Sequence, residues 1–244
     1  MAKKTLEHQG HPDHRALAGG AVRAGVFGFS DGLVSNVSLI IGFAAATSGS
    51  GVVDASNVRL AGIAAAVAGA ASMAAGEWIS ISAQNELVGR EIALELRELK
   101  MNPVAETSEL AAMYRQHGMS SEQASISARE VMTNPERAVL VHAREEFGLD
   151  PDHLPNPIQI AVVSLITFLF GAMLPVIPWL FGGGSNARST SVGIAVVAAA
   201  IAGGAIGHQA ERSKVTSAVR QVAVMLLAVT VTYLIGRLVG MGIN

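Results

Sequence analysis

The chain of 244 residues is 50% hydrophobic, has a mean hydropathy of +0.43, and carries charged side chains at only 15% of its positions. Soluble domains average about 25% charged residues, so this composition favours an integral membrane protein. The absence of cysteine excludes disulfides, thiolate zinc sites and iron–sulfur clusters. No nucleotide-binding loop, nucleophile triad or basic patch is present, so we expect neither an enzyme nor a nucleic-acid-binding protein.

Five apolar segments approach or exceed the ~20 residues that a helix needs to cross about 30 Å of hydrocarbon. A polar insert with 13 acidic and 7 basic residues over positions 84–153 separates the second from the third. The sequence therefore predicts an all-α membrane protein, with five transmembrane helices and a helical cytoplasmic insert between spans two and three. The apolar segments are residues 24–47, 58–83, 158–181, 190–208 and 216–239. The expected domains are a cytoplasmic tail at 1–22, helices one and two at 23–83, the cytoplasmic insert at 84–156, and helices three to five at 157–244.

Positive charges predict the orientation, because Lys and Arg are enriched in cytoplasmic loops. Of the 17 Lys and Arg residues, 14 lie before the first span, in the insert, or around the turn between spans four and five. Five spans place these three regions on one side, so we expect a cytoplasmic N-terminus and insert. The first 20 residues lack the apolar core of a signal peptide. The absence of a long targeting extension favours a bacterial plasma membrane over the vacuolar membrane of a eukaryote.

Boundary signals divide the insert into helices. The first continues span two as far as Asn102 and Pro103, and further helices follow at 105–118, 120–133 and 134–148. Ser120 or Ser121 is the expected N-cap of the helix at 120–133. The last helix begins at Asn134 with Pro135 in its first position, and Gly148 follows its end.

One acid interrupts the first apolar segment, GVFGFSDGLVSNVSLIIGFAAA, at residues 25–46. A carboxylate such as Asp31 costs roughly 2.5–3.5 kcal/mol at membrane depth on insertion scales. Ser35 and Ser38 share its helix face. Intramembrane acids usually face a bundle interior or a water path, so we expect a cavity or a close helix contact here. The alternative is that Asp31 reaches the headgroups and pairs with Arg23.

The second span carries Met73 and Glu77 one turn apart, among small residues that permit close helix approach. A soft thioether beside a hard carboxylate suits a borderline divalent metal. The alternatives are that Met73 fills a gap in a helix interface and that Glu77 is an interfacial residue beside Trp78.

The insert offers carboxylates on several helices, and one imidazole four residues before a glutamate. Helices that present inward carboxylates bind hard or borderline divalent cations. The alternative is a solvated charged surface on which His142 faces solvent beside Arg144. The candidate metal ligands are Glu95, Glu98, Glu106, Glu109, His142 and Glu146.

Four stretches occur in a characteristic order: SDGLVSNVSLIIGFAA, AGIAAAVAGAASMAAGEWISISAQNE, NPERAVLVHAREEFGLD and LITFLFGAMLPVIPWL. From about residue 23 onward the chain resembles the vacuolar iron transporter family. The resemblance implies a five-span homodimer that exports cytosolic Fe²⁺, often with Mn²⁺ or other divalent metals, in exchange for protons. It also implies a cytoplasmic three-helix metal-binding domain. By residue, it places Asp31 and Met73 in the transport path and assigns metal binding to Glu95, Glu98, Glu106, Glu109 and Glu146.

Two positions depart from the family pattern. Ala65 stands where some transporting members have a second glutamate on span two, and Glu77 is the carboxylate that remains there. His142 and Ala143 replace paired methionines, so an imidazole takes the place of thioethers. The preference among iron, manganese, cobalt and zinc is therefore open.

We expect a divalent metal transporter for Fe²⁺, with Mn²⁺ as a second candidate substrate, that serves metal detoxification and iron homeostasis by proton antiport. Metal is its substrate, and no prosthetic cofactor is expected. The expected partners are divalent metal ions, protons, membrane lipid and a second copy of the chain. The alternatives are a manganese-preferring exporter, a membrane-anchored metal sensor or store without transport, and a structural membrane protein. Asp31 and Met73 argue against a sensor, because binding alone needs no intramembrane ligands.

Overall fold

The computed structural model describes residues 20–47, 54–148 and 154–242, and all regular structure in these ranges is helical. The tail predicted at 1–22 therefore lies almost wholly outside the described residues. The elements are α1 (Gly20–Ala46), α2 (Ala55–Met101), α3 (Pro103–Gln116), α4 (Ser121–Val131), α5 (Pro135–Phe147), α6 (Pro157–Met173), the 3₁₀ turn η3 (Leu174–Val176), α7 (Ile177–Phe181), α8 (Gly184–Gln209) and α9 (Lys214–Gly242).

The prediction of five membrane-spanning segments is confirmed by length and composition, since the described ranges contain five helices long and apolar enough to cross a membrane. The second of them, α2, is 47 residues long and continues well beyond its apolar part. The third runs from Pro157 to Phe181 through α6, η3 and α7. Pro175 lies in η3 and Pro178 in α7, where missing amide hydrogens interrupt the regular hydrogen-bond pattern.

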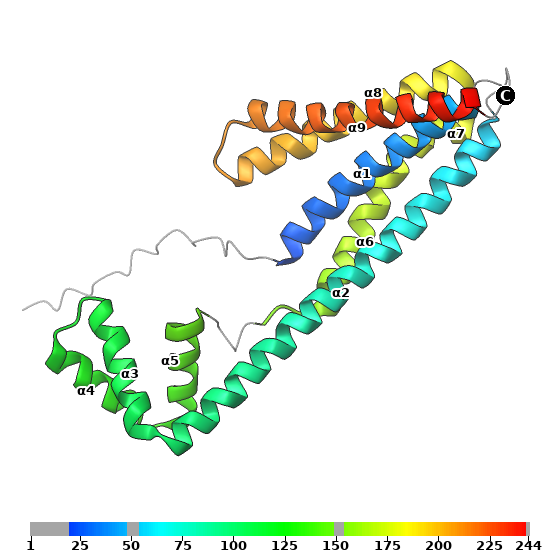
Figure 1. Ribbon diagram of the computed structural model, residues 1–244. Helices are drawn as coiled ribbons and strands as arrows, with labels where there is room; N and C mark the ends of the chain where they lie inside the picture. The colour runs from blue at the N-terminus through cyan, green and yellow to red at the C-terminus, as the bar shows by residue number, and fades with distance from the viewer. Residues whose placement is uncertain (1–19, 48–53, 149–153, 243–244) are drawn as a thin grey trace, which may run out of the picture. The chain divides into compact units, whose positions relative to one another are not determined.

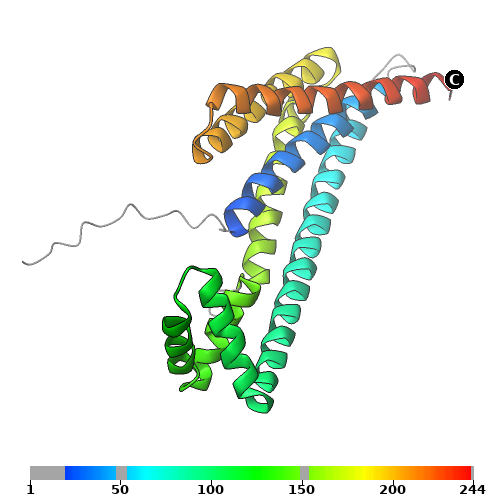
Figure 2. The same cartoon turned by 60° about the vertical axis from the view of Figure 1, so that its left-hand side comes forward.

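Contacts divide the chain into two compact units, residues 1–75 with 159–244 and residues 76–158. In the first unit, α1 packs against α8 and α9, and α8 lies beside α9 (Figure 1; Figure 2). Apolar side chains from these three helices form the largest core cluster of this unit. Its buried members are Leu33, Val37 and Ile41 of α1, Ala195 and Ala199 of α8, and Met225 and Val229 of α9.

Glycines bring the backbones of α1 and α6 together in this unit. A β-carbon at Gly171 of α6 would collide with the carbonyl oxygen of Phe29, and one at Gly32 would collide with the carbonyl oxygen of Phe168. Small residues allow membrane helices to approach this closely. The glycine that follows Asp31 therefore fixes α1 against α6.

The second unit contains α3, α4 and α5 together with the end of α2. The three short helices pack on one another (Figure 1), because each presents small or branched apolar side chains to a shared core. The buried members of this core are Leu110 and Ala111 of α3, Ala124, Ala128 and Val131 of α4, and Ala138 of α5.

The predicted N-caps of α4 and α5 are confirmed, whereas the helix predicted at 105–118 begins earlier, at Pro103. The Ser120 side chain accepts a hydrogen bond from the amide of Gln123 at the start of α4. The Asn134 side chain accepts from two amides at the start of α5, and Gly148 ends that helix with a left-handed φ of 63°. Only glycine adopts this conformation without steric cost.

Gly171→Ala should lower the thermal stability of the detergent-solubilised full-length protein. The new methyl group meets the backbone of Phe29, which cannot rotate away, and overpacking of this kind costs about 1–3 kcal/mol. Gly193→Ala on α8 is the matched control, because nothing lies within 4 Å of a β-carbon there. The measurement is size-exclusion profile against temperature. Equal midpoints for the two variants would contradict the close crossing of α1 and α6.

Candidate functional site

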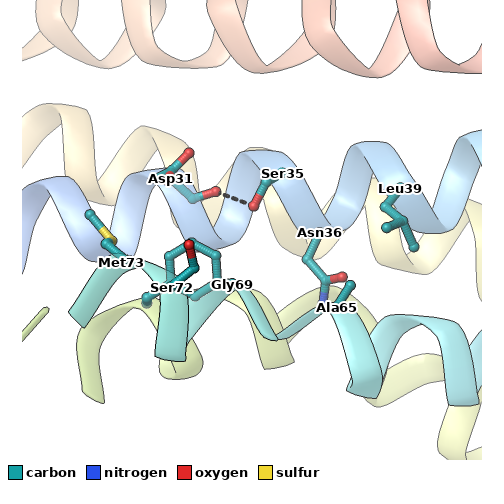
Figure 3. A pocket seen from close by; sticks show the side chains of 9 residues that line it. Asp31, Ser35, Asn36, Leu39, Ala65, Gly69, Ser72 and Met73 are labelled. Atoms are coloured by element: carbon teal, nitrogen blue, oxygen red, sulfur yellow. Dashed lines mark hydrogen bonds between the residues drawn. The ribbon is translucent and has the colours of Figure 1, made fainter. Parts of the chain in front are cut away.

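A cavity of about 350 Å³ lies among α1, α2 and α6 in the first unit (Figure 3). Two residues predicted for the transport path, Asp31 and Met73, both line it. The full lining is Asp31, Ser35, Asn36, Leu39, Ala65, Gly69, Ser72, Met73 and Phe168. The cavity therefore combines one carboxylate, one amide, two hydroxyls and one thioether within an otherwise apolar unit.

Asp31 and Ser35 are both exposed at the surface of the single chain. The Ser35 hydroxyl donates to the backbone carbonyl oxygen of Asp31 over 2.6 Å, so it is held by the helix backbone and not by the carboxylate. Within residues 20–47, no ion pair joins Asp31 to Arg23. The alternative reading of an Asp31–Arg23 pair is thus not supported.

Met73 is half-buried and packs against an apolar cluster that includes Ala66, Phe168 and Ala172. It both fills space between helices and lines the cavity. Glu77 is also half-buried, but it is not among the described residues that line the cavity. Ala65, which stands where some family members have a glutamate, lines the cavity. Asp31 therefore provides the only carboxylate among the described lining residues.

Asn36 is a polar, buried residue of the cavity lining for which the sequence predicted no role. Only 2% of it is exposed. Its side-chain nitrogen donates to the carbonyl oxygens of Gly62 on α2, over 3.2 Å, and of Ala172 on α6, over 2.6 Å. It therefore connects the three helices that enclose the cavity. A polar residue within an apolar segment was the signal that could have pointed to Asn36. The sequence could not identify its partners, because they lie 26 and 136 positions away.

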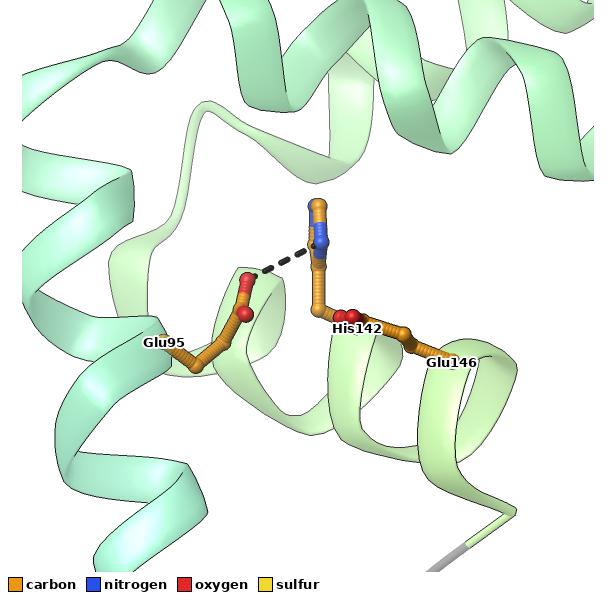
Figure 4. Close-up of side chains that lie close together, drawn as sticks. All are labelled: Glu95, His142 and Glu146. Carbon is orange, nitrogen blue, oxygen red and sulfur yellow. Dashed lines mark ion pairs between the residues drawn. The ribbon is translucent and has the colours of Figure 1, made fainter.

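The second unit holds a cluster of acidic and imidazole side chains. One ligand atom from each of Glu95, His142 and Glu146 lies within 4.8 Å of the other two, an arrangement that could hold a metal ion (Figure 4). Nδ1 of His142 is 3.0 Å from Oε1 of Glu95 on α2 and 3.9 Å from Oε2 of Glu106 on α3. Three helices therefore direct ligands to one point.

Burial separates three members of this cluster from an ordinary charged surface, whereas Glu146 is exposed. The exposed fraction is 0% for His142, 3% for Glu95 and 7% for Glu106, so the alternative in which His142 faces solvent is wrong. Among the described residues, the two ring nitrogens of His142 have no hydrogen-bond partner of good geometry. The same is true of Oε1 of Glu95. Buried polar atoms normally have a partner, and a divalent cation could bind one imidazole nitrogen of His142 together with Oε1 of Glu95.

The electrostatics of the cluster oppose accumulated negative charge. Burial, followed by the carboxylates of Glu146, Glu106, Glu98 and Glu109, raises the pKa of Glu95 to about 7. Burial and neighbouring carboxylates also raise the pKa values of Glu106 and Glu146. Burial lowers the pKa of His142 against the opposing effect of Glu109, so its imidazole stays neutral and keeps a lone pair for a metal.

Two of the predicted ligands have a different position. Glu98 and Glu109 are exposed and lie outside the group of three whose ligand atoms meet. They act on the buried members through charge, since both raise the pKa of Glu95. The structure thus brings Glu95, His142 and the exposed Glu146 together, with Glu106 3.9 Å from Nδ1 of His142, and it does not bring Glu98 or Glu109 into that group.

Five helices capable of spanning a membrane, an acid-lined cavity and a separate carboxylate–imidazole cluster define a membrane protein with two groups of potential metal ligands. A sequence profile of the VIT family matches residues 22–237, and the chain belongs to this family. It is 28% identical to vacuolar iron transporter 1 of Oryza sativa subsp. japonica, over 93% of this chain and 88% of that protein. It is 30% identical to vacuolar iron transporter 1 of Arabidopsis thaliana, over 83% of this chain and 79% of that protein. These relatives are transporters and not enzymes.

Glu95→Gln should stabilise the metal-free protein, and more so at higher pH. The folded-state pKa of about 7 lies above the ordinary 4.5, so the stability that Glu95 contributes is present below about pH 4.5 and is lost as pH rises through about 7. The His142 contribution runs in the opposite sense and is common to both proteins. The difference between variant and wild type should grow by on the order of 1–2 kcal/mol between pH 5 and pH 8.

Thermal unfolding of the full chain in chelator, at those two pH values, measures this difference. Glu122→Gln is the matched control, because Glu122 is exposed in the first turn of α4. A Glu95→Gln effect that is the same at both pH values would contradict the electrostatic description of the cluster.

His142→Ala should weaken Zn²⁺ binding by the full chain at least about tenfold, because loss of even an outer-shell partner of a metal site costs about 10–100-fold. It should weaken Mn²⁺ binding less. Imidazole suits zinc and iron, whereas manganese prefers carboxylate and carbonyl oxygen. Calorimetric titration of both metals measures the effect, with His117→Ala as the control because His117 is 62% exposed. If neither affinity changes in His142→Ala, then His142 is not a ligand.

Proposed function

We propose that this chain exports Fe²⁺, with Mn²⁺ as a second substrate, from the cytosol in exchange for protons. The observation that supports this most directly is the cavity, which combines Asp31 and Met73 inside the membrane-spanning unit of a VIT family member. The curated relatives named vacuolar iron transporters favour iron as the cargo. Export of surplus metal would serve detoxification and iron homeostasis.

Asp31 is the exchange group in this proposal. A carboxylate at membrane depth is stable when a cation or a proton neutralises it, and a metal ion displaces the proton when it binds. A volume of about 350 Å³ admits the ion with part of its water shell, because a water molecule occupies roughly 30 Å³ in the liquid. Met73 adds a soft ligand that Mg²⁺ and Ca²⁺ do not favour.

The insert at 84–156 is the cytoplasmic metal-binding domain of this proposal, with its orientation given by the Lys and Arg distribution. Buried Glu95 and neutral His142 are suited to capture cytosolic metal, since binding releases the proton held by Glu95. The exposed Glu98 and Glu109 increase the local concentration of cations around the buried ligands. Glu146 and Glu106 complete the ligand set.

The exposure of Asp31 and Ser35 on the single chain supports a homodimer in this proposal. Hydrocarbon around a carboxylate is costly, so a second copy of the chain would cover this face and the two Asp31 residues would line a shared path. Glu77, one turn beyond Met73 on α2, would lie at the cytosolic entrance of that path. The membrane is the plasma membrane in a bacterium or the vacuolar membrane in a eukaryote.

Asp31→Asn should abolish metal flux in proteoliposomes, because an amide neither exchanges a proton nor neutralises a cation. The assay follows Fe²⁺ or Mn²⁺ uptake together with lumenal pH, and wild-type protein should couple the two. Asp54→Asn is the matched control. Asp54 is an exposed acid that precedes α2, and its side chain accepts a hydrogen bond from the amide of Ser56 in the first turn of that helix. Undiminished metal flux in Asp31→Asn would contradict the exchange role of Asp31. If the wild-type protein binds metal but transports none, a sensor or store would be favoured.

A further inference from the structure

Asn36 presents two chemically distinct faces to its surroundings. Its side-chain nitrogen donates to the carbonyl oxygens of Gly62 and Ala172. Both partners are pure acceptors, so the amide orientation is set by chemistry, with nitrogen toward the helices and oxygen away from them. Ala172 lies in the last turn of α6, where carbonyl groups lack helical donors, and Pro175 has no amide hydrogen to offer.

The side-chain oxygen of Asn36 has no hydrogen-bond partner among the described residues, although the residue is only 2% exposed. Buried amide oxygens are rarely left without a partner, because desolvation without a compensating bond destabilises the fold. The same residue lines the cavity that holds Asp31 and Met73 (Figure 3). The partner of this oxygen is therefore to be sought inside the cavity.

We propose that Asn36 is a specificity-determining residue of the path, and that its side-chain oxygen binds the divalent cation beside Asp31. This inference rests on the proposed function and adds a ligand to it. The nitrogen of the same amide, fixed by α2 and α6, holds the oxygen in place before the ion arrives, so little conformational freedom is lost on binding.

The composition of the cavity wall leaves room for a further oxygen ligand. Ala65 and Gly69 contribute no ligand atoms, and Asp31 is the only carboxylate among the described residues of the lining. A carbonyl oxygen replaces a water molecule of the ion without adding a second charge. Hard oxygen ligands suit Mn²⁺ and Fe²⁺, whereas the thioether of Met73 favours softer ions. Asn36 would thus favour the harder ions over soft ones such as Cd²⁺.

The competing explanation is that Asn36 only connects three helices. The two readings differ in what they predict for metal selectivity. Loss of a helix connection lowers the amount of folded protein or the rate for every ion alike. Loss of an oxygen ligand changes the ratio between a hard and a soft ion.

The test uses the full chain in proteoliposomes, with Mn²⁺ and Cd²⁺ as probes in separate and competing uptake. Asn36→Ala should raise the KM for Mn²⁺ about tenfold with a smaller change for Cd²⁺, so that the Mn²⁺-to-Cd²⁺ preference falls. Ser164→Ala is the matched control, because Ser164 is a fully buried α6 residue whose hydroxyl also lacks a partner among the described residues and which does not line the cavity. It should leave the preference unchanged.

Asn36→Asp keeps oxygen at this position and removes the donors to Gly62 and Ala172, so it separates the two readings even where Asn36→Ala fails to fold. The ligand reading predicts that the wild-type preference for Mn²⁺ persists in Asn36→Asp. An equal loss for both metals in Asn36→Ala, or a lost Mn²⁺ preference in Asn36→Asp, overturns the inference alone. Wild-type liposomes that take up neither metal overturn the proposed function and this inference with it.

Discussion

A carboxylate removed from water needs a cation or a proton beside it, and both candidate sites follow from this constraint. Asp31 lies within a helix long and apolar enough to cross a membrane. Glu95 lies in a protein core among other carboxylates, which raise its pKa together with burial. Each site is unfavourable when it is empty and ionised, and each becomes favourable when a divalent ion or a proton enters. The free-energy cost of a desolvated carboxylate therefore favours the binding of metal and the binding of protons alike.

Close backbone contacts between helices shape the cavity in which a cation or a proton can neutralise Asp31. Gly32 and Gly171 let α1 and α6 touch through their carbonyl groups, and Asn36 ties both to α2. Ring atoms of Phe168 would lie only 2.5 Å from a β-carbon at Gly69, so the ring occupies the space that a larger residue there would need. The cavity is therefore bounded by close-packed backbone on one side and by a buried aromatic ring on another.

Local signals in the sequence predicted the helices, and distant contacts determined the sites. Hydropathy and capping residues such as Asn134 and Gly148 act within a few residues, so the spans and the insert helices were predictable. The presence of Asp31 and Met73 in one cavity followed from helix faces and family resemblance. The amide of Asn36 meets partners 26 and 136 positions away, and no periodicity encodes that. Likewise, Glu95 is buried and Glu98, about one turn further along α2, is exposed, because His142 of α5 lies against Glu95.

The part of the cavity wall that α2 supplies consists largely of side chains with little or no bulk, at Ala65, Gly69 and Ser72. The Phe168 ring leaves no room for a side chain at Gly69, but Ala65 and Ser72 line the open cavity, where a new donor group could be accommodated. In the proposed transporter, a few side chains of the cavity wall would then determine the ion preference, and the path of the backbone would not. A lineage exposed to a different metal could change its cargo by point substitution while keeping the same helix framework.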